Sequence, residues 1–222
     1  MVEAKENRLF ISLFRYYTWL LFRRRFNGVW LKNDYSAQPG GPVIYYSNHN
    51  SWWDGLIPFL LNEFLWHHNG RALIEEHQIH KYPFFKRIGA FSVNRNHRRD
   101  VISALRFAAG SLKRPNACLY LFPEGKIQPF EASLQPTFEG GLTWLSFHRS
   151  DLDIVPIALY IHTMHSDKPR LLIHIGEALR FNAKQTQYKK ERTACFQNAL
   201  GGYLRHINSP EQPGKMGFHK WI

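Results

Sequence analysis

Cysteine is scarce in this sequence: two of its 222 residues are cysteines, Cys118 and Cys195. Two thiols offer no framework of disulfides and no cluster of metal ligands, so a disulfide-stapled scaffold and a cysteine-based metal centre are excluded. Cys118 lies in an apolar run of strand type, where a buried structural thiol is the usual role. A reducing cytosolic compartment is consistent with this composition.

A long uncharged apolar run is also lacking. The most apolar region, residues 9–31, is interrupted by Arg15 and by Arg23–Arg25, so its longest uncharged stretch is Tyr16–Phe22. A membrane span needs roughly 20 apolar residues, and a secretory signal needs a small-residue cleavage site, so we expect neither. Aromatic and leucine side chains followed by arginines are typical of a helix in the membrane interface. We predict that residues 1–31 form such a segment; a helix docked on the protein's own core is the alternative.

Acidic residues are few, with 17 Asp and Glu against 29 Lys and Arg, and the formal net charge is +12. This excess predicts anionic partners, among which nucleic acids, anionic membrane surfaces and phosphate-bearing thioesters qualify. No nucleic-acid-binding motif accompanies the charge, so we do not expect nucleic acid as a partner. A hydrophobic content of 44% excludes a disordered chain.

Strand-type and helix-type segments alternate along the chain without internal repeats. We predict strands at residues 26–32, 43–46, 71–74, 90–94, 117–122, 154–161 and 170–175. We predict helices at residues 54–66, 77–87, 101–113, 138–147 and 184–207. Alternation of this kind is typical of an α/β fold. We therefore expect one layered domain over residues 32–222, with a mixed, largely parallel central sheet flanked by helices, plus the N-terminal amphipathic interfacial helix.

Four local features complete this expectation. Ser92 and Asn94 alternate with apolar residues, which predicts a half-exposed strand. Asp100 is placed to cap the helix that follows it. Residues 126–137 are expected to form a long loop, and residues 209–222 an irregular tail.

The stretch at residues 43–55 changes from strand type to helix type. His49 falls at the strand exit and Asp54 near the helix start. A carboxylate that accepts a hydrogen bond from one ring nitrogen leaves the other as a base for a hydroxyl proton. The same spacing recurs at residues 148–153 and 162–167, but only the first pair lies between a strand and an apolar helix. We predict His49 as the base and Asp54 as its orienting partner; a loop histidine beside a helix-capping aspartate is the alternative.

Three later blocks follow this NHxSxxD motif in order: Gly-x-Phe-x-Val-x-Arg at Gly89–Arg95, Phe-Pro-Glu-Gly at Phe122–Gly125 and Val-Pro-Ile-Ala at Val155–Ala158. Together the four blocks resemble those of the glycerolipid and lysophospholipid acyltransferases, over about residues 25–180. The resemblance implies acyl transfer from acyl-CoA or acyl carrier protein to a hydroxyl of a lysophospholipid or related lipid. It implies direct action of His49 without an acyl-enzyme, no cofactor or metal, and a peripheral or monotopic place at the cytoplasmic face of the membrane.

The resemblance also implies where the lipid acceptor binds. In similar enzymes the arginine of the second block and the Glu-Gly of the third line the acceptor pocket. Arg95 offers donors that match a phosphate or a carboxylate, and Glu124, beside Gly125, can accept a hydrogen bond from an acceptor hydroxyl. A solvated loop arginine is the alternative for Arg95.

The chain departs from the family pattern after the third block. Lys126–Gln128 stand where Thr-Arg-Ser is common, and Phe138–Gly141 stand where a Phe-Lys-x-Gly-like segment is usual. Cations expected near an acceptor phosphate are therefore missing or moved, although Lys126 is a candidate replacement for one. This weakens lysophosphatidate as the acceptor. A glycolipid, another lipid alcohol or another lysolipid stays open as the acceptor. A non-catalytic lipid-binding protein on the same fold stays open as the function of the chain.

Overall fold

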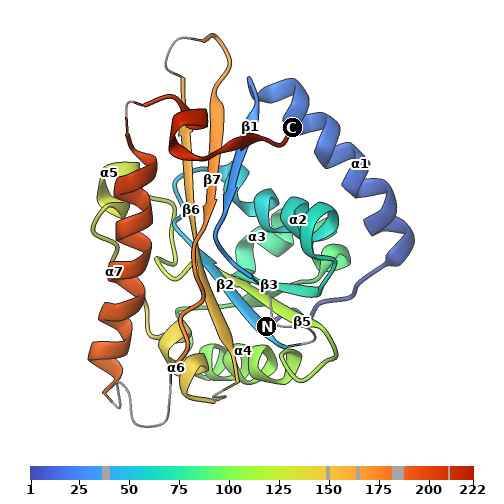
Figure 1. Cartoon of the computed structure of the whole chain (residues 1–222). Helices are drawn as coiled ribbons and strands as arrows, with labels where there is room; N and C mark the ends of the chain where they lie inside the picture. The colour runs from blue at the N-terminus through green and yellow to red at the C-terminus, as the bar shows by residue number, and fades with distance from the viewer. Residues whose placement is uncertain (37–40, 149–150, 164–165, 182–187, 210) are drawn as a thin grey trace.

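The computed structural model describes the whole chain except residues 37–40, 149–150, 164–165, 182–187 and 210. Within the described residues, a central sheet crosses the molecule and helices lie on both of its faces (Figure 1). Its strands are β1 (Val29–Asn33), β2 (Val43–Ser47), β3 (Asn69–Glu75), β4 (Ala90–Val93), β5 (Ala117–Leu121), β6 (Asp153–His162), β7 (Arg170–Ile175) and β8 (His219–Lys220).

The described strands are ordered β4-β3-β5-β2-β6-β7-β1-β8 across the sheet. Five of the seven neighbouring pairs in this described sheet are parallel, and the pairs β6 with β7 and β1 with β8 are antiparallel. The predicted mixed, largely parallel sheet is therefore confirmed. Central parallel strands are covered on both faces, which is why β2 and β5 are buried along their whole length.

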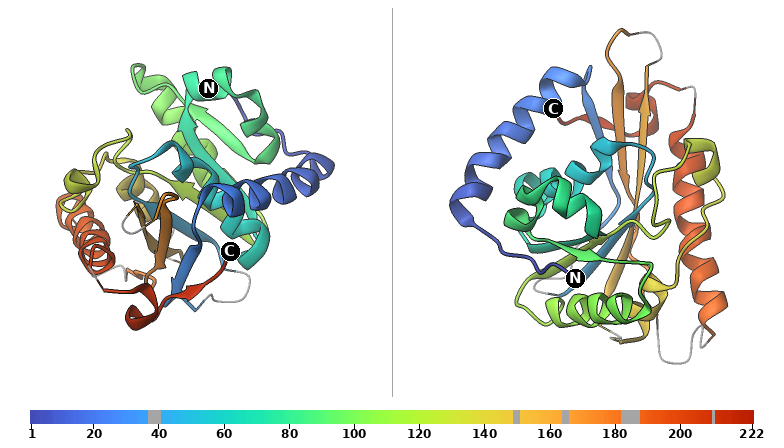
Figure 2. Two further views of the ribbon diagram at one scale, coloured as in Figure 1. Left: turned by 90° about the horizontal axis from the view of Figure 1, so that it is seen from above. Right: turned by 180° about the vertical axis from the view of Figure 1, so that it is seen from behind.

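Two groups of helices and turns cover the two faces of the sheet (Figures 1 and 2). One face is covered by α1 (Arg8–Arg25), η1 (Trp52–Leu56), α2 (Ile57–Leu61), η2 (Asn62–Trp66), α3 (Glu76–Lys81) and η3 (Pro83–Ile88). The opposite face is covered by α4 (Arg98–Ser111), α5 (Phe130–Ser133), α6 (Gly141–His148), α7 (Lys189–Ile207) and η4 (Pro213–Met216). This layered α/β architecture confirms the predicted fold class.

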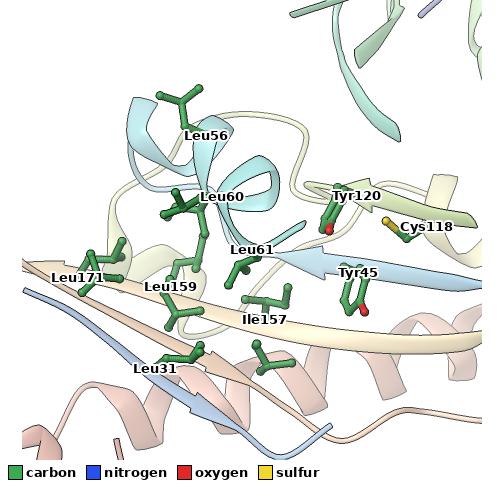
Figure 3. Close-up of a cluster of buried hydrophobic side chains, with 14 of the residues drawn as sticks. Leu31, Tyr45, Leu56, Leu60, Leu61, Cys118, Tyr120, Ile157, Leu159 and Leu171 are labelled. Atoms are coloured by element: carbon green, nitrogen blue, oxygen red, sulfur yellow. The ribbon is translucent and has the colours of Figure 1, made fainter. Parts of the chain in front are cut away.

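Alternation along the strands divides the apolar side chains between two cores. In β2, Tyr45 joins the core beneath α1 and α2, whereas its neighbour Tyr46 joins the core beneath α4 and α7. Figure 3 shows the first core, in which Leu61 of α2 lies over Ile157 and Leu159 of β6. Burial of each large apolar side chain contributes roughly 1.5–3 kcal/mol. The two cores together hold the sheet rigid beneath the strand exits.

Two predicted helices are broken into shorter pieces. The helix predicted at residues 54–66 consists of the 3₁₀ turn η1, the α-helical turn α2 and the π-helical turn η2. The helix predicted at residues 77–87 consists of α3 and the 3₁₀ turn η3, which starts at Pro83. Proline has no backbone N–H to continue the hydrogen-bond series of α3, so the helix ends before it.

Two of the local expectations, for Ser92 and for Asp100, are wrong. The strand β4 is fully buried, since the Val2 N–H donates to the Ser92 hydroxyl (2.6 Å) and the Ser92 N–H donates to the Val2 carbonyl (2.8 Å). The N-terminal segment therefore covers the side of β4 that was predicted to face solvent. The helix α4 begins at Arg98 with His97 as its N-cap, so Asp100 is not the cap. Asp100 lies in the first turn, where its negative charge interacts favourably with the helix dipole.

The other two expectations fail because short elements occur in apparent loops. The predicted loop at residues 126–137 contains α5, and the predicted irregular tail contains η4 and β8. β8 pairs antiparallel with β1 through Leu31 and His219. The last predicted helix is α7, and residues 184–187 of that prediction lie outside the described residues.

The helix α1 has two different sides. Phe22 is fully buried and Phe14 contacts Phe59 of α2 with ring centroids 5.2 Å apart, so one side packs on the domain. The other side exposes large apolar residues at helical spacing: Leu9, Leu13, Tyr16, Tyr17 and Leu20. No helix within the described residues combines the length and apolarity needed to cross a bilayer. The division of the chain into residues 1–31 and 32–222 stays a prediction.

Candidate active site

The site lies where the parallel strands β2, β3, β4 and β5 end. Because parallel strands run in the same direction, the residues that follow them gather at one edge of the sheet, the edge at which α/β proteins bind ligands. His49 comes two residues after β2, Glu75 ends β3, Arg95 comes two residues after β4 and Glu124 follows β5. The ends of these parallel strands therefore bring most of the predicted site residues to one edge of the sheet.

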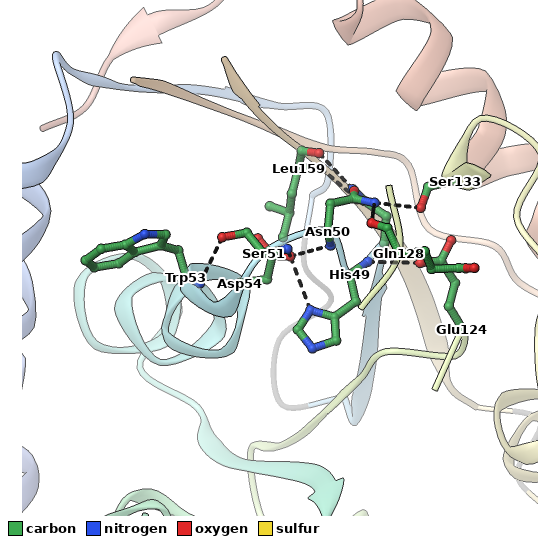
Figure 4. A network of polar contacts seen from close by, with 10 residues as sticks. His49, Asn50, Ser51, Trp53, Asp54, Glu124, Gln128, Ser133 and Leu159 are labelled. Atoms are coloured by element: carbon green, nitrogen blue, oxygen red, sulfur yellow. Dashed lines mark hydrogen bonds and ion pairs between the residues drawn. The ribbon is translucent and has the colours of Figure 1, made fainter. Parts of the chain in front are cut away.

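His49 and Asp54 meet directly (Figure 4). His49 Nδ1 lies 3.2 Å from Asp54 Oδ2. The side chain of His49 is 19% exposed, whereas that of Asp54 is 2% exposed. Since Nδ1 of a neutral imidazole donates its hydrogen to the carboxylate, the lone pair is left on Nε2, the ring nitrogen turned away from Asp54. This arrangement presents a base toward the open side of the site.

The Asp54 carboxylate is held by the turn that contains it. Its Oδ2 atom also accepts hydrogen bonds from the backbone N–H groups of Asn50 and Ser51, each at 2.7 Å. The Ser51 hydroxyl accepts in turn from the Trp53 N–H at 3.1 Å, which completes a capping box at the start of η1. The aspartate therefore caps the turn and contacts the imidazole with the same oxygen, so the two sequence interpretations of Asp54 describe one geometry.

An aromatic ring restrains the His49 imidazole from another side. The rings of His49 and Phe122 are stacked, with centroids 4.3 Å apart and planes 24° apart. Phe122 begins the Phe-Pro-Glu-Gly block, and its role as a packing surface for the imidazole was missed in the sequence. With Asp54 on one ring nitrogen and Phe122 against one ring face, the imidazole has little freedom to rotate.

Glu124 is buried, with 4% of its surface exposed. Its Oε2 atom accepts a hydrogen bond from the His49 backbone N–H at 3.0 Å. Its Oε1 atom is also buried and accepts no hydrogen bond from the described residues. A buried acceptor without a donor is unfavourable, so this oxygen is suited to a ligand that brings a hydroxyl donor.

Two asparagines that flank His49 fix its loop, and sequence reasoning missed both. The Asn48 side chain donates to the Leu159 carbonyl (2.8 Å) and accepts from the Leu159 N–H (2.9 Å), which ties the loop to β6. Asn50 Nδ2 donates to the Gln128 carbonyl (2.8 Å) and the Ser133 hydroxyl (2.9 Å). The only available signal was the pair of amides beside a histidine at a strand exit.

Arg95 is engaged by two carboxylates. Its Nε atom lies 2.7 Å from Glu75 Oε1 and its Nη1 atom lies 2.9 Å from Glu139 Oε1. The hydrogen bond that Arg95 donates to Glu75 is the main cause that raises the pKa of Arg95, and the hydrogen bond to Glu139 adds to it. The sequence predicted a guanidinium that faces an acceptor, and neither carboxylate partner was predicted.

Gly125 lies against this cluster. Its φ angle is +70°, and a Cβ atom at this position would come within 2.6 Å of Arg95 Nη1 and 2.7 Å of Glu139 Oε1. The positive φ angle favours glycine here, and a larger residue would also have to displace the ends of the Arg95 and Glu139 side chains. Lys126, the next residue, is exposed. The structure thus brings His49, Asp54, Glu124, Gly125 and Arg95 into one chain of contacts, with Lys126 next to them in sequence.

The other two matches to the histidine–aspartate spacing look different. Asp153 accepts from Arg180 Nε at 2.6 Å and from the Tyr35 hydroxyl at 2.9 Å. His148 Nδ1 lies 2.8 Å from the Trp144 carbonyl instead. For the third match, the Asp167 carboxylate accepts from the Ser166 hydroxyl at 3.3 Å. Strand and helix context, rather than spacing, distinguishes His49 and Asp54.

Comparison with known proteins agrees with this geometry. Residues 29–141, slightly more than half of the chain, match the family model described as Acyltransferase. The chain belongs to the acyltransferase family. His49, Asp54, Arg95 and Glu124 all lie within the matched residues of this acyltransferase-family chain. None of the curated proteins matches it significantly.

A solved structure with a similar fold is the crystal structure of PlsC, the 1-acyl-sn-glycerophosphate (LPA) acyltransferase from Thermotoga maritima. The TM-score is 0.62 at 14% sequence identity, and the match covers 90% of this chain and 80% of that chain. At this identity the likeness concerns the fold alone.

A cavity of about 270 Å³ lies beside the histidine–aspartate pair of this acyltransferase-family chain. Gly55 and Phe122, which adjoin Asp54 and the His49 ring, line it. Its apolar wall includes Phe59 and Ile74, and Tyr120 lines it with a buried hydroxyl that has no nitrogen or oxygen partner in the described residues. Within the same residues, no group of three or more His, Cys, Asp and Glu side chains is arranged to hold a metal ion.

Proposed function

We propose that this chain transfers a fatty acyl group from a thioester to a hydroxyl of a lipid, with His49 as the general base. The single observation that carries the proposal is the contact of His49 Nδ1 with the buried carboxylate of Asp54, which leaves Nε2 as a proton acceptor. Membership of the acyltransferase family supports the reaction class.

The proposed reaction is one direct transfer. His49 Nε2 removes the proton from the acceptor hydroxyl while that oxygen attacks the thioester carbonyl carbon. A C–O bond forms and the C–S bond breaks, and the imidazolium returns the proton to the leaving thiolate, so the products are an ester and a free thiol. Asp54 stabilises the imidazolium between these steps. Glu124 Oε1 accepts a hydrogen bond from the acceptor and orients it.

The thioester is the proposed source of the acyl chain, either as acyl-CoA or as acyl carrier protein. The cavity of about 270 Å³ is the proposed place of that chain, because Gly55 and Phe122 line it beside the catalytic pair. Its volume is close to the lower end of small-ligand pockets, which is about 300 Å³. Phe59 and Ile74 offer apolar surface for an acyl chain, and charged side chains such as Arg71 and Arg114 line another part of the cavity.

The proposed location is the cytoplasmic face of a membrane, peripheral or monotopic, where thioester donors and lipid acceptors meet. The exposed apolar side of α1 supports contact with lipid, and Leu13 and Leu20 are 65% and 61% exposed. Arg23, Arg24 and Arg25 end the same helix, and each basic residue near an anionic surface contributes about 1 kcal/mol. Sedimentation with anionic vesicles tests this: the Leu13→Ser, Leu20→Ser double variant is expected to bind at least about tenfold more weakly.

The test of the reaction is acyl transfer from acyl-CoA and from acyl carrier protein to a panel of lipid alcohols, with analysis of the lipid product. The His49→Ala variant is expected to lose about 10²- to 10⁴-fold in kcat while its thermal unfolding is unchanged. His148→Ala is the matched control, because His148 is exposed and shares the five-residue spacing without the aspartate contact. Lipid binding without turnover by the unaltered protein across the panel would instead favour a non-catalytic lipid-binding role.

A further inference from the structure

The carboxylates near the proposed acceptor site outnumber the cations. Asp54 and Glu124 lie at His49, and Glu75 and Glu139 lie at Arg95. Arg95 is paired with two of these four carboxylates, and Lys126, the exposed residue after Gly125, is a further cation next to them in sequence. The excess of positive charge over the whole chain is therefore weaker at this position.

Two nitrogens of the Arg95 guanidinium already donate to carboxylates. Nε faces Glu75 and Nη1 faces Glu139, and the two carboxylates come from different elements. Bidentate recognition of a phosphate uses two neighbouring N–H groups of one arginine. A phosphate would have to displace these carboxylates or lie beside them with like charge, so Arg95 is a poor phosphate ligand in this arrangement.

The Arg95–Glu139 pair is part of the wall of the site. Glu139 is attached to the third-block turn, because its backbone N–H donates to the Pro123 carbonyl at 2.8 Å. Gly125 lies so close to both partners that a Cβ atom would contact Arg95 Nη1 at 2.6 Å. The pair therefore borders the turn that carries Glu124, instead of lying elsewhere on the surface.

Glu124 requires a hydrogen-bond donor from the headgroup. Its Oε1 atom is buried and lacks a donor within the described chain, although Oε2 is occupied by the His49 N–H. The one free hydroxyl of lysophosphatidate is the group that reacts at His49, and its phosphate dianion has no hydrogen to donate to this oxygen, whereas a neutral polyol has further hydroxyl donors. The unpaired oxygen and the occupied arginine favour the same kind of headgroup.

We propose that the acceptor of this chain is a lipid with an uncharged, polyhydroxylated headgroup, such as a glycosyl or glycerol group, and not a phosphate-bearing lysolipid. This inference rests on the proposed acyl-transfer function and specifies its acceptor. The Glu124 carboxylate accepts a hydrogen bond from a headgroup hydroxyl, and Glu139 keeps Arg95 from binding a phosphate.

The test compares kcat/KM for three acceptors with the same hydrocarbon chain: an alkyl glucoside, a monoacylglycerol and lysophosphatidate. The unaltered protein is expected to prefer at least one of the two uncharged acceptors over lysophosphatidate by about tenfold or more. The glucoside and the monoacylglycerol distinguish a sugar from a glycerol headgroup. A preference for lysophosphatidate, lost in His49→Ala, would overturn this inference and leave the proposed function in place.

The Glu139→Lys variant tests the cause of the preference. It removes one of the two carboxylates that engage Arg95, leaves Glu75 in place and adds a cation, so the ratio of kcat/KM for lysophosphatidate to that for the uncharged acceptor is expected to rise about tenfold or more. Glu139→Gln, which keeps the shape, is expected to raise it less. Glu131→Lys, an equal change of charge at an exposed position of α5, is the control and should leave the ratio unchanged.

Failure of the two proposals is distinguishable in these assays. If neither Glu139 variant changes the ratio while both remain folded and active, Arg95 and Glu139 do not select the acceptor and this inference is wrong. If no acceptor of either class gives acyl transfer that depends on His49, the proposed function itself is wrong. Should Glu139→Lys fail to fold, Glu139→Gln and the preference of the unaltered protein still decide the matter.

Discussion

Two histidine–aspartate pairs of the described chain use the same groups in opposite ways. In the active-site pair, His49 Nδ1 lies 3.2 Å from Asp54; in the second pair, His174 Nε2 lies 2.6 Å from Asp34. At the site the imidazole is 19% exposed and the carboxylate 2%, whereas in the second pair the imidazole is 3% exposed and the carboxylate 35%. A base must reach a substrate, so the partner that faces solvent determines what the pair can do.

The second pair also leaves its free ring nitrogen enclosed. His174 Nδ1 is buried and has no hydrogen-bond partner among the described residues. The rings of Tyr203, His206 and Phe218 surround it, with centroids 4.7, 5.5 and 5.6 Å away. Asp54, in contrast, is held by two backbone N–H groups in addition to the imidazole. The imidazole of the first pair can therefore reach a substrate, as the proposed function requires, whereas aromatic rings enclose the imidazole of the second pair.

The largest expected effect comes from removal of the aspartate charge. Asp54→Asn keeps the shape and an oxygen for the backbone N–H groups, but it cannot stabilise the imidazolium or fix the reactive tautomer. We expect kcat to fall about 10²- to 10⁴-fold, measured by acyl transfer with saturating thioester. The matched change Asp34→Asn should leave kcat within about twofold. A folded Asp54→Asn variant with nearly full kcat would contradict the role given to Asp54.

Removal of the buried imidazole is expected to affect stability instead of turnover. His174→Ala deletes a ring at a position that is 2% exposed and leaves a cavity among three aromatic residues. We expect the free energy of unfolding in urea to fall by about 2–3 kcal/mol, with kcat of the folded protein unchanged. His206→Ala, at an exposed neighbouring position, should cost less than about 1 kcal/mol. Loss of kcat in folded His174→Ala would remove the distinction between the two pairs.

The pH dependence of stability sharpens the contrast further. Burial lowers the pKa of His174; the Asp34 hydrogen bond opposes this, and Lys32 and His206 add to it. With a folded pKa below the unfolded value of about 6.5, the unfolded chain binds the proton more readily, so His174 reduces stability as pH falls below about 6.5. Urea unfolding between pH 7.5 and pH 5 should show a steeper loss for the unaltered protein than for His174→Gln. Equal slopes would show that His174 does not titrate in this way.

Local patterns in the sequence were sufficient for seven of the eight described strands and for the contact of the first pair. The apolar runs of β2 and β5 and the change from strand to helix between His49 and Asp54 are each contained in a few neighbouring residues. Such patterns depend only on residues that are neighbours in the sequence, so they can be recognised before the fold is known. The same reasoning failed at Ser92, because its cover comes from Val2 at the other end of a 90-residue separation.

Polar contacts between residues far apart in the sequence were beyond sequence reasoning. Arg95 and Glu139 are separated by 44 residues, and His174 and Asp34 by 140 residues. No apolar period marks these partners. His174 and Asp34 meet because β7 lies next to β1, and Glu139 is held near Arg95 by the hydrogen bond of its N–H to the Pro123 carbonyl. The sequence therefore predicted Arg95 as an acceptor ligand, whereas the structure adds the two carboxylates that change its chemistry.

The smallest expected effect concerns the aromatic ring beside each imidazole. Stacking of Phe122 on His49, with centroids 4.3 Å apart, restrains the base in its reactive orientation. Phe122→Leu keeps an apolar contact but removes this stacking, which contributes roughly 0.5–1.5 kcal/mol, so kcat should fall about two- to tenfold. Phe218→Leu is the matched change beside His174, and it should lower stability by about 1 kcal/mol without changing kcat. If both substitutions changed only stability, the ring of Phe122 would act as packing alone, and the orientation of His49 would depend on Asp54 and its loop.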